Sequence, residues 1–254
     1  MLQAGLVSIT FRQLAPARVV ALAQEARLRS IEWGGDRHVP PGDGQRAREV
    51  GAMTRDAGLA VSAYGSYYRL RDEAEEDAPF GAVLATALAL GAPLVRVWAG
   101  ARSPDATPAA ERERIIGRAQ DICAQASAAG LRVALEYHRN TLTETSGMTC
   151  GLLRRVAGAG VYWQPRTGWP ARENLAAIEA VTPWLGNVHC FHWWPTARER
   201  LPLARGARDW QLYLERLARL PGERHVSLEF VRGDDPAQFL RDAATLRAWL
   251  EPYA

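Results

Sequence analysis

The sequence alternates strand-length apolar runs with helix-length segments, and this alternation limits the fold more than any other feature. Apolar residues recur with a period of two in the first kind of segment and with helical spacing in the second. Strand and helix repeated eight times over about 250 residues are typical of a (β/α)₈ barrel, the TIM barrel. We therefore predict one α/β domain over residues 1–254. The expected strands begin at residues 5, 30, 59, 93, 131, 161, 187 and 224, and the clearest helical segments are 15–30, 44–58, 80–91, 108–130 and 235–250.

The ends of the predicted helices carry their own signals. Gly58, Gly91 and Gly130 each stand just before an expected strand, where a glycine commonly ends a helix. The least regular helical segment is 174–186, because Pro183 interrupts it.

Composition excludes several classes of function. All 31 basic residues are arginine, and without lysine the chain cannot form the Schiff base of a covalent aldolase. The net charge is only +3 and the arginines are spread over the predicted helices, so we expect no nucleic-acid partner. No segment resembles a membrane span or a secretory signal, which favours a cytoplasmic protein. Three cysteines without a CxxC pair are expected to be buried free thiols rather than disulfides or zinc ligands.

Polar residues fall on the faces of the strands that should point into the barrel. In barrels of this type chemistry occurs at the C-terminal ends of the strands. Side chains alternate between the two faces of a strand, and the aliphatic positions should face the helices. Polar groups left inside are costly unless they are paired or used. The residues expected at the barrel mouth are Glu32, Tyr64, Arg96, Glu136, Gln164, His189 and Glu229.

Four of these strand ends resemble the xylose isomerase-like barrels, a superfamily of sugar isomerases and epimerases that also contains endonuclease IV-type enzymes. The residues that carry the resemblance are Glu136 in VALEYHRNTLTET, Gln164 in VYWQP, His189 in NVHCFHWW and Glu229 in HVSLEF. The resemblance implies that these four positions hold one divalent cation, namely manganese, magnesium, cobalt or zinc. It also implies that Glu136 and Glu229 flank the substrate and move a proton between neighbouring carbons.

The chemistry of these side chains agrees with that implication. Hard or borderline divalent cations favour carboxylate oxygens with one imidazole. Such an ion polarises a ketose carbonyl and stabilises the enediolate formed when the α-proton leaves. Gln164 departs from the superfamily, which has an aspartate at this position. We expect either a weakly bound metal, held more firmly with substrate present, or a lapsed site in a protein that binds without catalysing.

Other polar and aromatic residues near the strand ends are candidates for substrate contacts. The resemblance implies that loop arginines after the seventh strand bind substrate hydroxyl or phosphate groups. Aromatic rings could form an apolar wall over a sugar. The expected substrate-binding residues are Glu32, Tyr64, Arg96, Trp98, His138, His192, Arg200 and Arg205, and the candidate aromatic wall comprises Tyr64, Tyr67, Tyr68, Trp33, Trp98, Trp193 and Trp194.

Three functions remain open at this point. The first is a metal-dependent isomerase or epimerase of a small sugar or related polyol ketone, with dehydration as a variant of the same chemistry. The second is a non-catalytic sugar-binding barrel. The third is an abasic-site endonuclease, which we disfavour because its zinc cluster needs an aspartate and a histidine where this chain has Gln164 to Thr167. The sequence leaves open whether the protein forms a homo-oligomer.

Overall fold

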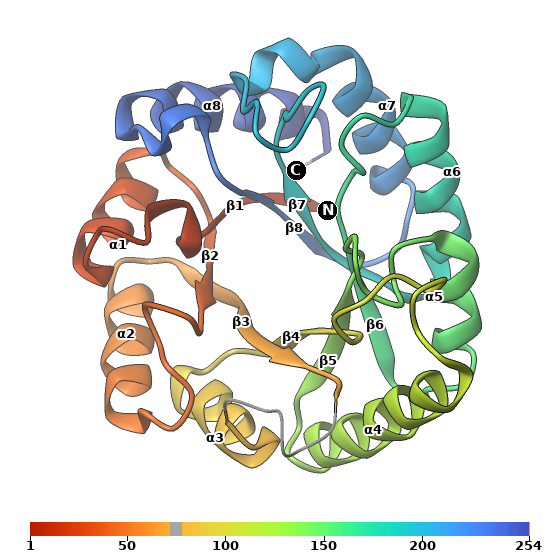
Figure 1. Ribbon diagram of the computed structural model, residues 1–254. Helices are drawn as coiled ribbons and strands as arrows, with labels where there is room; N and C mark the ends of the chain where they lie inside the picture. Colours follow the sequence, from red (N-terminus) through yellow and green to blue (C-terminus); the bar gives the residue numbers. More distant parts are fainter. Residues whose placement is uncertain (72–77, 254) are drawn as a thin grey trace.

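Eight parallel strands close into a barrel and pair in sequence order, and the helices surround it (Figure 1). This computed structural model describes residues 1–71 and 78–253. The predicted TIM barrel is therefore confirmed. The strands are β1 Leu2–Val7, β2 Ser30–Gly34, β3 Ala60–Arg69, β4 Leu94–Trp98, β5 Arg132–Glu136, β6 Ala159–Trp163, β7 Leu185–Cys190 and β8 Arg224–Leu228. The helices are α1 Pro16–Glu25, α2 Gly44–Asp56, α3 Phe80–Leu90, α4 Ala109–Ala128, α5 Ser146–Leu153, α6 Ala171–Val181, α7 Ala207–Ala218 and α8 Pro236–Leu250.

The helix ends follow the local rules of capping. Gly58, Gly91 and Gly130 all adopt positive φ just after a helix, as a left-handed cap requires. Helix α6 ends at Val181, and Pro183 lies in the 3₁₀ turn Thr182–Trp184 that follows it. Proline stops the α-helix there because it cannot donate the next backbone hydrogen bond.

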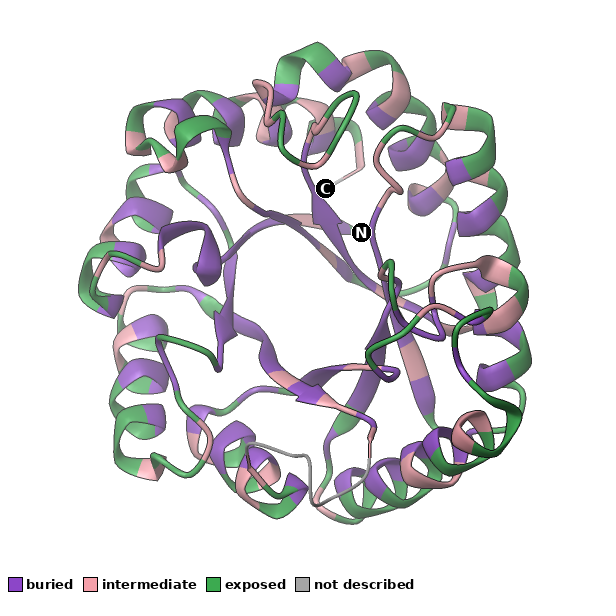
Figure 2. Cartoon of the chain, viewed as in Figure 1, coloured by how far each residue is buried: buried purple, intermediate pink, exposed green. Residues whose placement is uncertain are grey.

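The main hydrophobic core lies between the barrel and its ring of helices, whose inner faces are buried while their outer faces are exposed (Figure 2). A second, smaller cluster of Ala63, Leu94, Ala134 and Tyr162 fills the inside of the barrel. Burying apolar area on both faces of the strands stabilises the fold by about 25 cal/mol per Å². The three cysteines are buried and free, as predicted.

None of the helices in the described part of the chain is both long and apolar enough to cross a lipid bilayer.

Tyr64 does not face the barrel mouth, contrary to prediction. The pairing of β2 with β3 shifts register by one residue, so that Glu32 lies opposite Ala63 rather than opposite Ser62. The extra residue reverses the alternation of β3, and Tyr64 turns into the outer core, where its hydroxyl donates to the carbonyl of Val39 at 2.8 Å. Tyr64 is fully buried and is not one of the residues that line the cavity at the barrel mouth.

This placement predicts that Tyr64→Phe weakens the fold and leaves the barrel mouth intact. The substitution removes one buried hydrogen bond and leaves the carbonyl of Val39 without its donor. We expect the free energy of unfolding to fall by about 1–2 kcal/mol, measured by urea denaturation. An unchanged unfolding free energy together with altered metal or sugar binding would place Tyr64 at the mouth after all.

Candidate metal and substrate site

Four strand ends bring a histidine, an amide and two carboxylates to one point. His189 lies near the end of β7 and Glu136 ends β5, while Gln164 and Glu229 follow β6 and β8 directly. The Nδ1 atom of His189 lies 3.4 Å from Gln164 Oε1, 3.6 Å from Glu136 Oε1 and 3.7 Å from Glu229 Oε2. All four side chains are buried. The period-2 alternation that predicted these residues on one face therefore brings them together in space.

The donor set fits one divalent cation. Metal bonds of about 2.0–2.2 Å place neighbouring ligand atoms roughly 3.0–3.6 Å apart, which is close to the spacing found here. Glu136, His189 and Glu229 form the one group of acidic, histidine or cysteine side chains in the described residues that could hold a metal ion. Gln164 adds a carbonyl oxygen beside this group, and its amide nitrogen donates to Glu136 Oε1 at 3.2 Å.

A buried arginine and a further glutamate lie beneath these donors. Arg96 on β4 donates from Nε to Glu32 Oε1 at 2.7 Å and from Nη1 to Glu136 Oε2. Glu32 Oε2 also lies 3.0 Å from His189 Nε2, so that Nδ1 faces the other donors. A carboxylate behind a ligating histidine fixes the orientation of the ring. Trp98 donates its indole N–H to Glu136 Oε2 as well, so Oε1 is the oxygen of Glu136 that faces Gln164 and His189.

The ion pair under the site needs a glycine on the neighbouring strand. A Cβ on Gly65 would lie 2.6 Å from Nη2 of Arg96 and 2.7 Å from Oε1 of Glu32. Real Cβ atoms do not approach these groups so closely, so any other residue at position 65 would displace the pair. The register shift in β3 is what directs this glycine, rather than Tyr64, into the barrel.

Burial and ion pairing give the three glutamates different proton affinities. Burial opposes ionisation of Glu32, but Arg96 and His189 outweigh it and lower the pKa of Glu32 to about 2. The pKa of Glu136 also lies well below its usual value, because Arg96 and then His189 outweigh burial. Burial raises the pKa of Glu229, since the nearby imidazole offsets it only in part. Glu229 is thus the carboxylate best suited to take up and release a proton.

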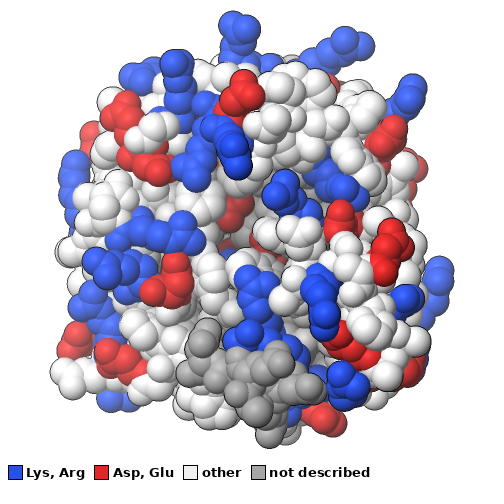
Figure 3. Space-filling model, in the orientation of Figure 1, with Lys and Arg blue, Asp and Glu red and all other residues white. Residues whose placement is uncertain are grey.

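A cavity of about 190 Å³ opens above the metal donors. Figure 3 shows the face of the molecule that carries it, with a central hollow in which acidic atoms are visible and basic side chains around its rim. An adjoining cavity of about 130 Å³ shares His138, Gln164 and Trp193 with it. The residues that line the larger cavity are Ile9, Arg12, Tyr67, Arg96, Trp98, Glu136, His138, Gln164, Trp193, Glu229 and Phe230.

The predicted substrate-binding residues divide between the cavity and other places. Arg96, Trp98 and His138 line the cavity. The ring centroids of Trp98 and His138 lie 5.2 Å apart. Glu32 lies beneath Arg96, with no exposed surface. His192 does not line the cavity; it lies against Gly206 and lines a small neighbouring pocket beside α7. The alternation of β7 explains this, because His189, Phe191 and Trp193 share the inner side and His192 takes the outer one.

The two loop arginines also lie away from the metal donors. Arg200 donates to Asp234 at 2.7 Å and lies 4.4 Å from the ring centroid of Phe230, so it supports the cavity wall from behind. Arg205 is exposed on the 3₁₀ turn Leu203–Gly206 and lines neither of these two cavities. The placement of both residues argues against the direct substrate contacts expected from sequence.

The aromatic wall is smaller than the sequence suggests. Tyr67, Trp98 and Trp193 line the cavity, while Trp194 is exposed. Trp33, Tyr64 and Tyr68 belong to the outer core.

Sequence reasoning missed Ile9, Arg12 and Phe230, which complete the cavity wall. Arg12 is held by Asp36, 2.6 Å from its Nε, and by the hydroxyl of Tyr67. The first strand ends at Val7, and a 3₁₀ turn of Ser8–Phe11 carries the chain to the mouth. An arginine directly after the first apolar run, residues 5–11, was the signal that could have identified Arg12.

Comparison with models of protein families relates this chain to known proteins. The model of the xylose isomerase-like TIM barrel matches residues 20–251. The chain belongs to that family. A search of the curated proteins found no match to it.

Solved structures share the barrel over its full length. The probable 3-DHS dehydratase AsbF of Bacillus anthracis has a TM-score of 0.76 at 18% identity, with 96% of this chain and 99% of that one covered. The IOLI protein with a bound zinc atom has a TM-score of 0.76 at 15% identity, with 99% of each chain covered. The 3-keto-D-glucoside 4-epimerase YcjR of E. coli has a TM-score of 0.73 at 17% identity, covering 99% of this chain and all of that one. At these identities the likeness shows the fold.

The buried ion network predicts an alkaline loss of stability in the metal-free protein. Burial opposes the charge on His189, but Glu229 and Glu32 outweigh it and raise the pKa of His189 from 6.5 to about 10. A raised folded-state pKa contributes stability that is complete below about pH 6.5 and is lost as the pH rises through about 10. The lowered pKa of Glu32 acts in the opposite direction, with stability lost as the pH falls from 4.5 toward about 2.

In the presence of chelator, we therefore expect the free energy of unfolding to fall by a few kcal/mol between about pH 7 and pH 10. Chemical denaturation at several pH values measures this, with His189→Gln as the comparison. A variant that loses stability over the same range as the wild type would show that another group is responsible.

Proposed function

We propose that this protein is a divalent-metal-dependent isomerase or epimerase of a small sugar or related polyol ketone. The observation that carries the proposal is the convergence of Glu136 Oε1, Gln164 Oε1 and Glu229 Oε2 on Nδ1 of His189, at the floor of a cavity. The zinc atom in the IOLI structure and the epimerase activity of YcjR, both on the same fold, support this assignment.

The charge of the site suits a divalent cation. Three glutamates and Arg96 carry two net negative charges when His189 is neutral, and one divalent ion would cancel them. This offers a reason for an amide at position 164. An aspartate there would add a fourth carboxylate to a buried cluster that holds one guanidinium, whereas the amide of Gln164 also donates to Glu136. A bound cation would supply Lewis-acid polarisation of a substrate carbonyl.

We assign the two glutamates different roles. Arg96 and Trp98 both donate to Glu136, so this residue serves mainly to hold the cation. Glu229 has no arginine hydrogen-bonded to it among the described residues, lines the cavity and has a raised pKa. Glu229 would therefore take the proton from the carbon next to the carbonyl. In an isomerase it would deliver this proton to the former carbonyl carbon. An epimerase needs a second group that protonates the enediolate from the opposite face, and Glu136 would have to fill that role. The prediction that Glu136 also moves a proton stays a prediction.

The cavity wall supports a small polyhydroxylated substrate. A volume of about 190 Å³ is below the roughly 300–1,000 Å³ of drug-sized ligand sites. The rings of Tyr67, Trp98 and Trp193 offer an apolar surface for C–H groups, and Arg12 and His138 offer polar contacts beside it. Loss of a β-hydroxyl from the same enediolate would make the enzyme a dehydratase, the activity named for AsbF.

A second candidate, a non-catalytic sugar-binding barrel, is favoured by one observation. Arg96 already pairs with Glu32 and Glu136, and His189 can carry a proton, so the carboxylates are partly neutralised without a metal. The endonuclease alternative has less support, because the described residues offer one metal-ligand group rather than a cluster of zinc sites.

Exchange of a substrate proton with solvent tests the proposal. We expect the wild-type protein with Mn²⁺ to wash deuterium from D₂O into the α-position of at least one of a panel of ketoses, measured by NMR. Glu229→Gln should slow this exchange by about 10²–10⁴-fold, as loss of a general base does. Glu113→Gln is the matched control, because Glu113 pairs with the exposed Arg155 on the outside of the barrel.

Equal exchange by wild type and Glu229→Gln would contradict the role of Glu229. A ketose that raises the melting temperature, with no exchange and no dependence on metal, would favour the non-catalytic barrel instead.

A further inference from the structure

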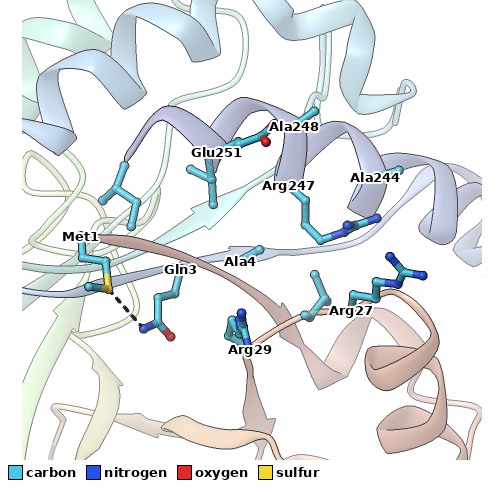
Figure 4. Close-up of a pocket in the computed structure, with 12 residues that line it drawn as sticks. Met1, Gln3, Ala4, Arg27, Arg29, Ala244, Arg247, Ala248 and Glu251 are labelled. Atoms are coloured by element: carbon cyan, nitrogen blue, oxygen red, sulfur yellow. Dashed lines mark hydrogen bonds between the residues drawn. The ribbon is translucent and has the colours of Figure 1, made fainter. Parts of the chain in front are cut away.

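A second hollow, of about 940 Å³, lies at the opposite end of the barrel from the metal donors. It is bounded by the start of β1, the turn from α1 into β2, and helix α8 (Figure 4). Strands β1 and β2 begin here and end at the barrel mouth, so a ligand in this hollow would not reach the cavity above Glu229. Binding at this end is therefore independent of the proposed function.

Three arginines line this hollow. Arg27 and Arg29 come from the turn after α1, and Arg247 comes from α8. No side-chain hydrogen bond or ion pair joins any of the three to another residue in the described part of the chain, and Nε of Arg247 is buried without an acceptor. Figure 4 shows Arg27 and Arg247 pointing toward one another across the hollow. Like charges that converge without a carboxylate between them favour an anionic ligand.

The backbone of Arg27 adds an independent observation. Its φ is 52°, in the left-handed region that costs a residue with a Cβ. Helices α2, α3 and α4 are each followed by a glycine in this conformation, at Gly58, Gly91 and Gly130. Helix α1 is followed instead by an arginine, although glycine would relieve the strain. A strained residue kept where glycine fits better is a mark of functional sites.

The rest of the lining indicates the kind of anion. Glu251 is the one acidic residue among those that line the hollow, against three arginines. The floor is apolar and is formed by small or buried side chains, namely Leu2, Ala4, Leu28, Ala244 and Ala248. Arginine guanidinium groups bind phosphate oxygens in pairs of hydrogen bonds.

We propose that this hollow binds a small molecule that carries a chain of phosphate groups, with Arg27, Arg29 and Arg247 holding the phosphates. Two sources share this chemistry, a nucleoside triphosphate and inorganic polyphosphate. The apolar floor gives a nucleoside a surface on which to rest, and inorganic polyphosphate would leave that surface uncovered.

Titration calorimetry with ATP and with inorganic tripolyphosphate tests this assignment. EDTA is included so that chelation of metal at the barrel mouth contributes nothing. We expect one binding site on the full chain, with affinity that falls as salt is added. Tighter binding of ATP than of tripolyphosphate would identify the nucleotide, and equal binding would identify the inorganic anion; either supports the phosphate site.

Four variants decide whether these residues are responsible. Arg247→Met should weaken binding at least fivefold, whereas Arg172→Met, with the same change of charge on the exposed face of α6, should not. Arg27→Gly should weaken binding to a similar extent and yet raise the melting temperature by about 1–3 °C, because glycine relieves the left-handed strain. Glu251→Gln should tighten binding.

The assignment is overturned if neither anion binds the wild-type chain. It is also overturned if Arg172→Met weakens binding as much as Arg247→Met does, since binding would then follow the overall charge. Because Arg27→Gly is expected to be more stable than the wild type, its loss of binding would not reflect unfolding.

Discussion

The ion pairs of Arg96 organise the whole barrel mouth. This guanidinium is buried between Glu32 and Glu136, and Glu32 in turn holds the ring of His189. Placing three carboxylates in one buried cluster costs several kcal/mol for each unpaired charge, and removing one partner from such a network usually costs about 3–5 kcal/mol. Arg96 therefore fixes the geometry at which Nδ1 of His189 and Oε1 of Glu136 face a common point. Gly65 is required for the same reason, because it leaves the space that the guanidinium occupies.

Most of the fold could be predicted from local patterns. Apolar periodicity and glycine caps located the strands and helices, because burial and capping act on neighbouring residues. The register of β3 could not be found in this way. The extra residue at position 62 changes only how β3 pairs with β2. As a result Gly65, rather than Tyr64, faces the inside of the barrel. A period-2 rule carried through an undetected bulge assigns every later residue of the strand to the wrong side.

The four residues predicted to hold the metal do lie together, because each stands within one residue of the end of its strand. The substrate contacts were less predictable. His192 points outward because side chains alternate along β7. Arg200 and Arg205 lie on a loop whose path depends on long-range contacts, such as the ion pair of Arg200 with Asp234. The wall that the structure does form includes Arg12 and Phe230, from loops far apart in sequence.

The position of a bound metal tests the central claim most directly. A crystal soaked with Mn²⁺ and measured at the manganese absorption edge would locate the ion by its anomalous scattering. We predict one peak within about 2.0–2.4 Å of Glu136 Oε1, Gln164 Oε1, His189 Nδ1 and Glu229 Oε2. The absence of a peak there under saturating Mn²⁺, with Arg96 and protonated His189 alone compensating the carboxylates, would contradict a metal-dependent enzyme.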